Sequence, residues 1–126
     1  MRKAVLILLA LSCVLLSGCS SNDKVTALPN GKYLLDGNTD VTTPYVLILG
    51  SNNFEFYYSV YSSYFAHGTY EIEADKLIMT TEDGKYVFVF QIKDGKIYYN
   101  LKQSSTVPEI NGEKPIKDGD QFVLTE

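Results

Sequence analysis

Two Asp-Gly pairs, Asp83-Gly84 and Asp94-Gly95, constrain the fold of this chain more than any other feature. An Asp-Gly pair between two alternating apolar runs is a strong signal for a two-residue β-hairpin, because a type I′ turn requires positive φ at both central residues. Ala74-Asp75 is interpreted as a third turn of the same length. Three tight turns in succession predict four consecutive antiparallel strands.

These turns also predict the register of the strands and a single apolar face. The expected opposite pairs are Glu73–Lys76, Ile72–Leu77 and Tyr70–Met79 at the first turn, Glu82–Lys85, Thr81–Tyr86, Met79–Phe88 and Leu77–Phe90 at the second, and Lys93–Lys96, Ile92–Ile97, Phe90–Tyr99 and Phe88–Leu101 at the third. A three-residue loop with a bulge is the alternative at Asp94, but it would slip one strand by a residue and turn its apolar set to the wrong face. The two-residue loop is therefore preferred.

Four more strands are expected outside this central region, at residues 32–35, 45–49, 54–60 and 121–124. About eight strands in about 95 residues predict an all-β fold, either a small antiparallel meander barrel or a strongly curved sheet. A two-sheet sandwich is the alternative. Residues 108–118 are polar and are expected to form a surface loop.

The turn between residues 45–49 and 54–60 is less well defined than the three central ones. Gly50-Ser51-Asn52-Asn53 is interpreted as its loop. This loop is expected to pair Leu47 with Phe56 and Leu49 with Phe54, which would make the two leucines part of the core.

The N-terminus has the composition of an export signal. Arg2 and Lys3 precede a thirteen-residue apolar segment at 4–16, and Leu16-Ser17-Gly18-Cys19 follows. This segment resembles the lipobox signal of bacterial lipoproteins, in which Leu, a small residue, and Gly or Ala precede Cys. The resemblance implies a signal helix in residues 1–18, cleavage before Cys19 and a lipid on Cys19. An uncleaved membrane anchor is disfavoured, because thirteen helical residues cover about 20 Å of a core about 30 Å thick.

Lipidation of Cys19 would leave the processed chain without a free thiol, since the other cysteine, Cys13, lies in the removed segment. Removal of Arg2 and Lys3 lowers the basic residues from 11 to 9, which with 15 acidic residues gives a net charge of −6. An acidic domain is a poor partner for nucleic acid. Residues 19–29 are expected to be a lipidated tether and residues 30–126 the β domain, held at the extracytoplasmic side of the cell membrane.

Part of the β region resembles a known module. The segments concerned are FEFYYS at 54–59, SSY at 62–64, GTYEI at 68–72, LIMTTEDGKY at 77–86, FVFQIKD at 88–94 and SS at 104–105. Their order is similar to a small lipocalin-like β module of low-GC Gram-positive lipoproteins, which also occurs beside antirepressor-type membrane peptidases. The resemblance implies an extracytoplasmic binding or sensing module and no catalysis. The alternative is a structural or accessory envelope lipoprotein that binds a partner protein.

A tyrosine cluster is the best candidate for a binding surface. Tyr57, Tyr61 and Tyr64 are separated by serines, and alternation places Tyr58 with the core while Tyr57 and Tyr61 face outward. Tyr and Ser together supply rigid contact area and adaptable hydrogen bonding, which suits an envelope glycan or protein. The alternative is that these tyrosines serve only as strand formers.

Other candidate chemistry is weak, and no catalytic residue, metal ligand or cofactor is expected. His67 is the only histidine, and no nucleophile elbow, zinc spacing or phosphate loop is present. Glu71, Glu73 and Asp75 alternate along one strand, which does not converge on an ion as a calcium loop does. Asp36, Asn38 and Asp40 have the spacing of the start of a calcium loop but lack its later Gly and Glu, so they are interpreted as a turn.

The outer face of the central strands is expected to carry an apolar strip of Ile78, Val87, Val89 and Tyr98, with Ile78 opposite Val89. An apolar strip of this kind requires a cover, either from the same chain or from a partner. Cover from the same chain is favoured.

Overall fold

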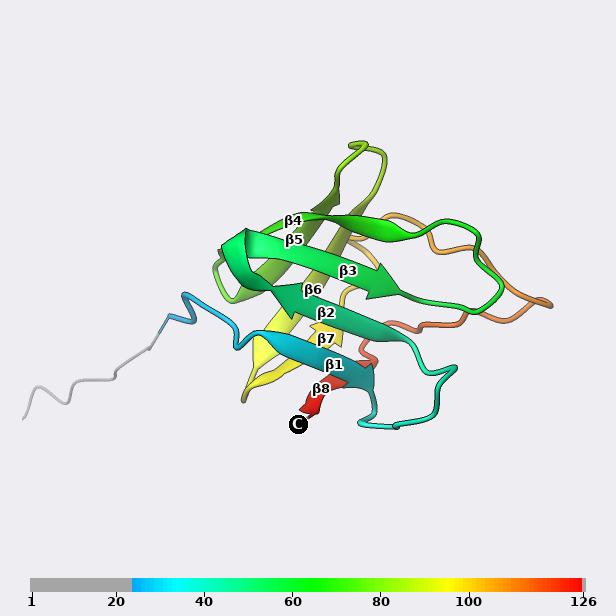
Figure 1. Ribbon diagram of the computed structural model, residues 1–126, viewed down its shortest axis with the longest axis horizontal. Coiled ribbons are helices and arrows are strands. Elements are labelled where there is room, and N and C mark those ends of the chain that lie inside the picture. Colours follow the sequence, from blue (N-terminus) through cyan, green and yellow to red (C-terminus); the bar gives the residue numbers. More distant parts are fainter. Residues whose placement is uncertain (1–23, 126) are drawn as a thin grey trace, which may run out of the picture.

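A computed structural model describes residues 24–125, so the expected signal segment and Cys19 lie outside the described residues. Eight antiparallel strands follow one another in chain order and close into a barrel (Figure 1), which confirms the predicted meander barrel over the sandwich. The strands are β1 (Gly31–Leu35), β2 (Tyr45–Leu49), β3 (Asn53–Tyr57), β4 (Ala66–Glu73), β5 (Lys76–Thr81), β6 (Val87–Lys93), β7 (Lys96–Tyr99) and β8 (Gln121–Thr125). Within residues 24–125, no helix has the length and hydropathy needed to cross a membrane.

The predicted register of the central strands is confirmed at each turn. Ile72 lies opposite Leu77, Met79 opposite Phe88, and Ile92 opposite Ile97. Both residues of Ala74-Asp75 and of Asp94-Gly95 have positive φ, as type I′ turns require. Ala74 adopts this conformation although its Cβ disfavours it.

The loop at Asp83-Gly84 keeps the predicted register by a different geometry. Only Gly84 of the pair has positive φ, and its N–H donates to the Thr81 carbonyl at 2.8 Å. The Thr81 N–H donates to the Tyr86 carbonyl at 3.0 Å, so the loop contains four residues rather than two. Since two residues are added symmetrically, the strand register is unchanged.

The predicted pairing of β2 with β3 is wrong by one residue. Val46 pairs with Phe56 and Ile48 pairs with Phe54, and all four side chains are buried. Leu49 instead lies opposite Asn53 and is 36 % exposed. The loop is one residue shorter than expected because Ser51 and Asn52 both adopt positive φ.

Two strands also end earlier than predicted. Strand β3 ends at Tyr57 rather than at residue 60, and β7 ends at Tyr99, so the predicted Phe88–Leu101 pair does not form. Beyond β7, serine side chains accept hydrogen bonds from the part of the β6 edge that β7 does not reach. The Val87 N–H donates to Ser105 Oγ at 2.9 Å, and the Val89 N–H donates to Ser104 Oγ at 2.8 Å.

Side chains fill the interior of the barrel. The Phe90 ring meets Phe122 edge to face at a centroid separation of 5.3 Å, and Phe56 meets Phe90 in the same way at 5.7 Å. The side chains that are almost fully buried are Tyr33, Tyr99, Phe54, Phe56, Phe88, Phe90, Phe122, Ile48, Leu77, Met79, Ile97 and Ile116. This interlocked packing of rings resembles a globular core rather than a hollow calyx.

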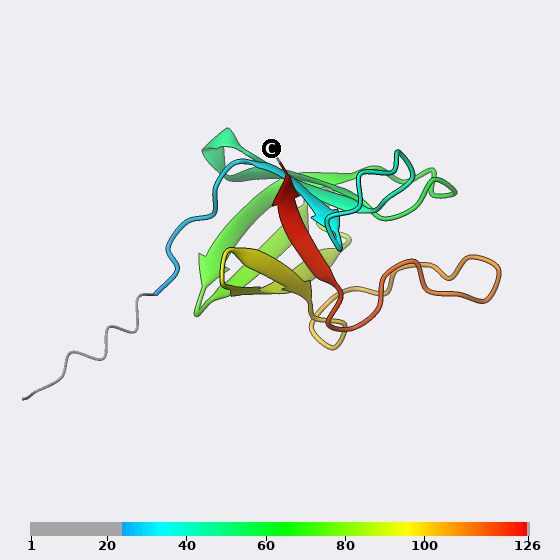
Figure 2. The same ribbon diagram turned by 90° about the horizontal axis from the view of Figure 1, so that it is seen from below.

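The two ends of the barrel differ in the length of their connections. One end carries the short turns at residues 50–52, 74–75 and 94–95, together with the chain that enters β1. The other end carries the loops at residues 36–44, 58–65, 82–86 and 100–120. Figures 1 and 2 show the loops at residues 36–44, 58–65 and 100–120 extending away from the chain that enters β1, and Figure 1 shows the loop at residues 82–86 projecting upward from the barrel.

Part of the expected tether contacts the barrel. Leu28 is 7 % exposed within the core cluster, and Val25 packs against that cluster. The Val25 N–H donates to Asp75 Oδ1 at 3.1 Å, and the Tyr33 hydroxyl donates to the Pro29 carbonyl at 2.9 Å. Residues 25–29 therefore cover the end of the barrel that carries the short turns.

The expected apolar strip on the outer face is only partly exposed. Ile78 lies opposite Val89 as predicted, and Val89 is buried. Ile78, Val87 and Tyr98 are half-buried. The Tyr98 hydroxyl donates to Gln121 Oε1 at 3.2 Å, so a neighbouring strand covers part of the strip.

Gly68 marks the closest approach of β4 and β5. A Cβ at this position would overlap the Thr80 carbonyl oxygen and would lie 2.8 Å from the Glu82 nitrogen. Only glycine fits such a contact between backbones.

Candidate functional site

A cavity of about 560 Å³ opens at the long-loop end of the barrel. This volume lies within the range of small-ligand sites. One wall consists of Tyr58, Tyr61, Ser62, Ser63 and Tyr64, the floor includes Tyr86 and Phe88, and the opposite wall is formed by residues 106–111. We call this cavity the tyrosine groove.

Serine side chains shape the first wall of the tyrosine groove. Ser59 Oγ accepts the Tyr61 N–H at 3.1 Å, and Ser62 Oγ accepts the Tyr64 N–H at 3.2 Å. The Ser62 hydroxyl also donates a hydrogen bond to the Tyr58 hydroxyl at 3.1 Å. Such local bonds from Ser side chains favour turns over a continued strand, so the chain leaves β3 after Tyr57.

A hydrogen-bond network fixes Tyr64 at the edge of the groove. The Tyr64 hydroxyl donates to Asp83 Oδ2 at 2.9 Å, and the Thr81 hydroxyl donates to Asp83 Oδ1 at 2.7 Å. The Lys85 N–H donates to Asp83 Oδ1 at 3.0 Å, and this bond is the largest cause that lowers the pKa of Asp83 to about 2. Partial desolvation raises the pKa of Tyr64, so its phenol stays protonated and remains a donor.

The floor of the groove is aromatic. The Tyr64 and Tyr86 rings lie 4.9 Å apart with a tilt of 58°, and the Tyr86 ring stacks on Phe88 at 6.2 Å. Phe88 also contacts Phe56 in the barrel core at 4.9 Å. The floor is therefore continuous with the rigid core, which holds these rings in place before any ligand arrives.

The second wall comes from the long connection between β7 and β8. Val107 and Ile116 are buried and attach this connection to the core, and Ile110 forms an isolated bridge with Glu113. Thr106, Glu109 and Asn111 are exposed along the wall. The prediction that residues 108–118 form a surface loop is therefore wrong at Ile116, which is buried in the core.

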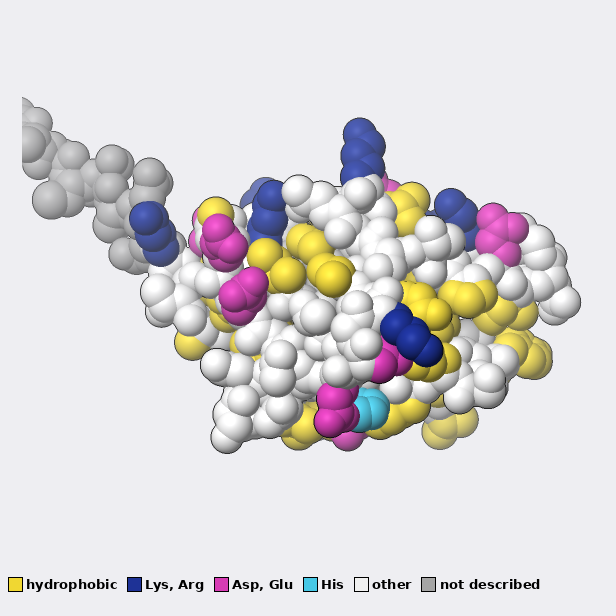
Figure 3. Space-filling view, turned by 90° about the horizontal axis from the view of Figure 1, so that it is seen from above, with side chains coloured by type: hydrophobic (Ala, Val, Ile, Leu, Met, Phe, Trp, Pro, Cys, Tyr) yellow, Lys and Arg dark blue, Asp and Glu magenta, His cyan; other side chains and the backbone are white. Residues whose placement is uncertain are grey.

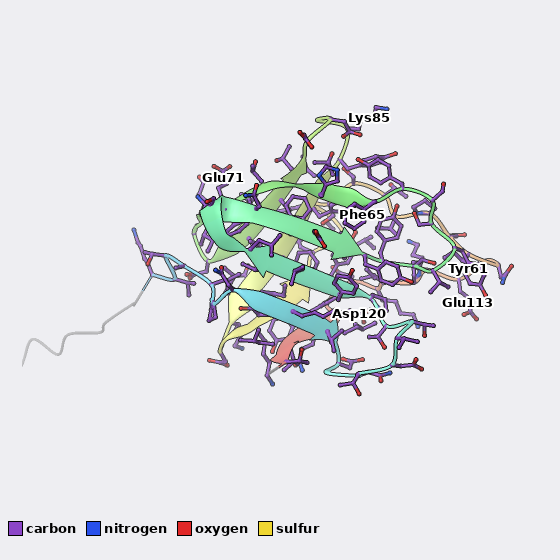
Figure 4. All side chains as sticks on the ribbon, in the orientation of Figure 1. Tyr61, Phe65, Glu71, Lys85, Glu113 and Asp120 are labelled. Carbon is purple, nitrogen blue, oxygen red and sulfur yellow. The ribbon has the colours of Figure 1, made fainter. Side chains whose placement is uncertain are left out.

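The three tyrosines predicted as binding residues do not lie together. Tyr61 and Tyr64 line the groove, whereas Tyr57 lies on the barrel wall and stacks on Tyr45 at 5.2 Å. Tyr61 is 76 % exposed. Figure 4 shows Tyr61 close to Glu113 from the second wall, at the end of the molecule opposite to Glu71.

Half of the groove was not predicted from the sequence. Side-chain alternation places Tyr86 and Phe88 only in strands, and the predicted surface loop at residues 108–118 includes only residues 108–111 of the second wall. These residues join the tyrosine cluster only through closure of the barrel. Their one local signal is the aromatic pair at Tyr86 and Phe88, which ordinary strand alternation also explains.

A second cavity, of about 550 Å³, lies on the outer face of β3, β4 and β5. His67 Nδ1 lies 3.4 Å from Glu82 Oε2, and Glu55 lines the same cavity. Both side chains of the pair are exposed, and Figure 3 shows the histidine beside acidic side chains on the surface. Among residues 24–125, no three His, Cys, Asp or Glu side chains form a group that could hold a metal ion.

The acidic residues at positions 71–75 and the oxygen donors at positions 36–40 do not form sites either. Glu71 and Glu73 are exposed on β4, and Asp75 binds the Val25 N–H. Asn38 Oδ1 accepts the Asp40 N–H at 3.0 Å, so the segment at residues 36–40 is a turn, as interpreted.

The tyrosine groove is therefore the site with the best-defined geometry. Its aromatic rings can stack on a ligand, and the hydroxyl, amide and carboxylate groups at its rim can form hydrogen bonds with that ligand. A scan against protein-family models found no match for this chain, and neither did searches of curated proteins and of solved structures.

Proposed function

We propose that this protein is a lipid-anchored, extracytoplasmic binding or sensing module that engages its ligand in the tyrosine groove without catalysis. The observation that carries the proposal is the position of the groove. It lies at the long-loop end of the barrel, opposite to the end where the chain enters β1. A chain tethered to a membrane through its N-terminus would present this groove away from the membrane.

The anchor in this proposal is the lipid on Cys19. The lipobox-like segment at residues 16–19 supports it, as does the short apolar segment before it. A single acyl chain binds a membrane only marginally, whereas two or three chains hold stably. The tether beyond Cys19 is short, because residues 25–29 pack on the barrel.

The side chains of the groove support binding better than catalysis. Its polar groups are hydroxyls, one amide and the Glu109 carboxylate. Asp83 at its edge is held ionised by three donors, so it is not poised to exchange a proton near neutral pH. His67 is not among the residues that line the groove, although it lines a smaller neighbouring cavity together with Tyr64 and Asp83.

A partner protein is the second candidate ligand. Large apolar side chains are exposed on loops at the groove end, namely Val41, Val60, Tyr61 and Phe65. Figure 3 shows many hydrophobic side chains at the end away from the N-terminal side, with a further group nearer to that side. Clustered exposed apolar groups are typical of protein contact surfaces.

Site-specific photocrosslinking in intact cells tests the proposal. A benzophenone amino acid replaces Tyr61 in the groove or, as the matched control, Tyr57 on the barrel wall. We expect a crosslinked product from position 61 and little from position 57, whatever the chemistry of the ligand. Equal products from both positions, or none from position 61, would overturn the groove as the binding site.

A further inference from the structure

We infer that the ligand of the tyrosine groove is a neutral carbohydrate, bound as a short oligosaccharide. This inference rests on the proposed function and specifies the ligand class of the same site. It follows from three properties of the groove: its flat aromatic faces, a rim whose hydrogen-bonding groups are neutral except for Glu109, and the ligand classes that the barrel excludes.

The aromatic faces suit a sugar ring. A pyranose has an apolar face of C–H groups, which packs flat against an aromatic ring while its hydroxyls point sideways. Tyr61 is 76 % exposed and offers such a face at the mouth of the groove. Tyr64 and Tyr86 lie 4.9 Å apart deeper in the groove and offer further ring surface. A cavity of about 560 Å³ leaves room for more than one sugar ring.

The rim supplies the complementary polar groups. Ser63, Thr106 and Asn111 line the groove and are exposed, so their side chains can donate and accept hydrogen bonds. Glu109 adds one strong acceptor. Sugar hydroxyls are both donors and acceptors, and this mixed rim matches them better than it matches a ligand of one polarity.

The groove is a poor site for charged ligands. No lysine or arginine is among its lining residues, so an anionic ligand would lack a counter-charge. A cation would find Glu109, but Asp83 already accepts bonds from Tyr64, Thr81 and Lys85. A neutral ligand avoids both difficulties.

The barrel also excludes two common modes of binding. Every strand pairs with two neighbours, and Ser105 and Ser104 accept the Val87 and Val89 N–H groups that β7 leaves on β6, so an extended peptide finds the β6 edge beside the groove already occupied. The rings of Phe56, Phe90 and Phe122 fill the interior, so an acyl chain finds no chamber of the kind seen in hollow barrels.

Saturation-transfer NMR on the full chain in micelles of a polyoxyethylene detergent tests the inference, since this detergent carries no sugar. The probes are N-acetylchitotriose and maltotriose as neutral trisaccharides, the deacetylated and cationic chitotriose, and tetramethylammonium. We expect transfer to the ring protons of at least one neutral trisaccharide. Tyr61→Ala should weaken that binding about tenfold or more, as for a central aromatic contact, and Tyr57→Ala should change it less than twofold.

Circular dichroism of both variants checks folding, and the exposure of Tyr61 leads us to expect native spectra. Absence of transfer to both neutral trisaccharides overturns the inference, as does binding of the cationic probes alone or an equal effect of the two substitutions. The crosslinking experiment separates the two proposals. A protein product at position 61 without sugar binding retains the proposed function and removes the carbohydrate.

Discussion

The rings of Phe56 and Phe88 meet edge to face with their centroids 4.9 Å apart and their planes at 73°. Phe56 belongs to β3 and Phe88 to β6, so the contact crosses the barrel. Phe88 also stacks under Tyr86 in the tyrosine groove. One pair of rings thus links the stability of the core to the shape of the tyrosine groove.

Truncation of a core ring should strongly destabilise the protein. Phe90 is fully buried, and Phe90→Ala is expected to lower the free energy of unfolding by about 3–5 kcal/mol. The milder Ile97→Val should cost about 0.5–1.5 kcal/mol, which keeps the test usable if the alanine variant does not fold. Urea denaturation measures both. A change below about 0.5 kcal/mol in both variants would contradict the described core.

Gly68→Ala should destabilise the barrel although it adds only a methyl group. The new Cβ would overlap the Thr80 carbonyl oxygen, and backbone cannot move aside as a flexible side chain can. We expect a loss of about 1–3 kcal/mol, as for other overpacked sites. Thr69→Ala, at the exposed neighbouring position of β4, is the matched control. Equal unfolding midpoints for the two variants would show that the close approach is not real.

Asp83 should make the stability of the protein depend on acid pH. Its pKa is lowered to about 2 from an ordinary value of 3.8, so folding favours the ionised carboxylate. This contribution is present in full above the ordinary pKa and is lost as the pH falls from about 4 toward 2. The difference in urea midpoint between the unaltered chain and Asp83→Asn should therefore shrink between pH 6 and pH 2.5. A difference that stays constant over this range would contradict the proposed bonds.

Lipidation of Cys19 is testable by mass. Cys19→Ala should abolish the acyl modification and leave the precursor uncleaved, because the sulfur that carries the lipid is missing. Mass spectrometry of the protein from a bacterial membrane fraction measures both effects. The conservative Ser20→Ala serves as control and should be processed normally. A lipidated N-terminus in the Cys19→Ala chain would refute the anchor.

The sequence predicted the central hairpins because turn chemistry and side-chain alternation agree there. Between Tyr70 and Tyr99, short loops at all three turns place the same apolar set on one face, and most of the turn residues have positive φ. A slip of one residue would expose the apolar set, so only one register is consistent. The loop at Asp83 has four residues instead of the predicted two, but the register of its strands is the predicted one.

Alternation fails where every residue is apolar. Residues 45–49 read Tyr-Val-Leu-Ile-Leu, so either face of β2 could be the inner one, and the true choice depends on the turn at Ser51 and Asn52. Only one wall of the tyrosine groove could be predicted from the sequence, and the reason is different from that for β2. Its second wall at residues 106–111 meets Tyr61 and Tyr64 through closure of the barrel, and no local pattern encodes that contact.

The separation of the groove from the entry point of β1 also determines how this molecule would respond to a pulling force. A load applied at the loop wall and resisted at Gly31 runs along the strands rather than across them. It stretches the hydrogen-bond ladders of β1 with β2 and with β8 in shear, so many bonds must fail together instead of one after another. The end of the barrel at Gly31 would therefore resist extension better than one whose strands separate one bond at a time.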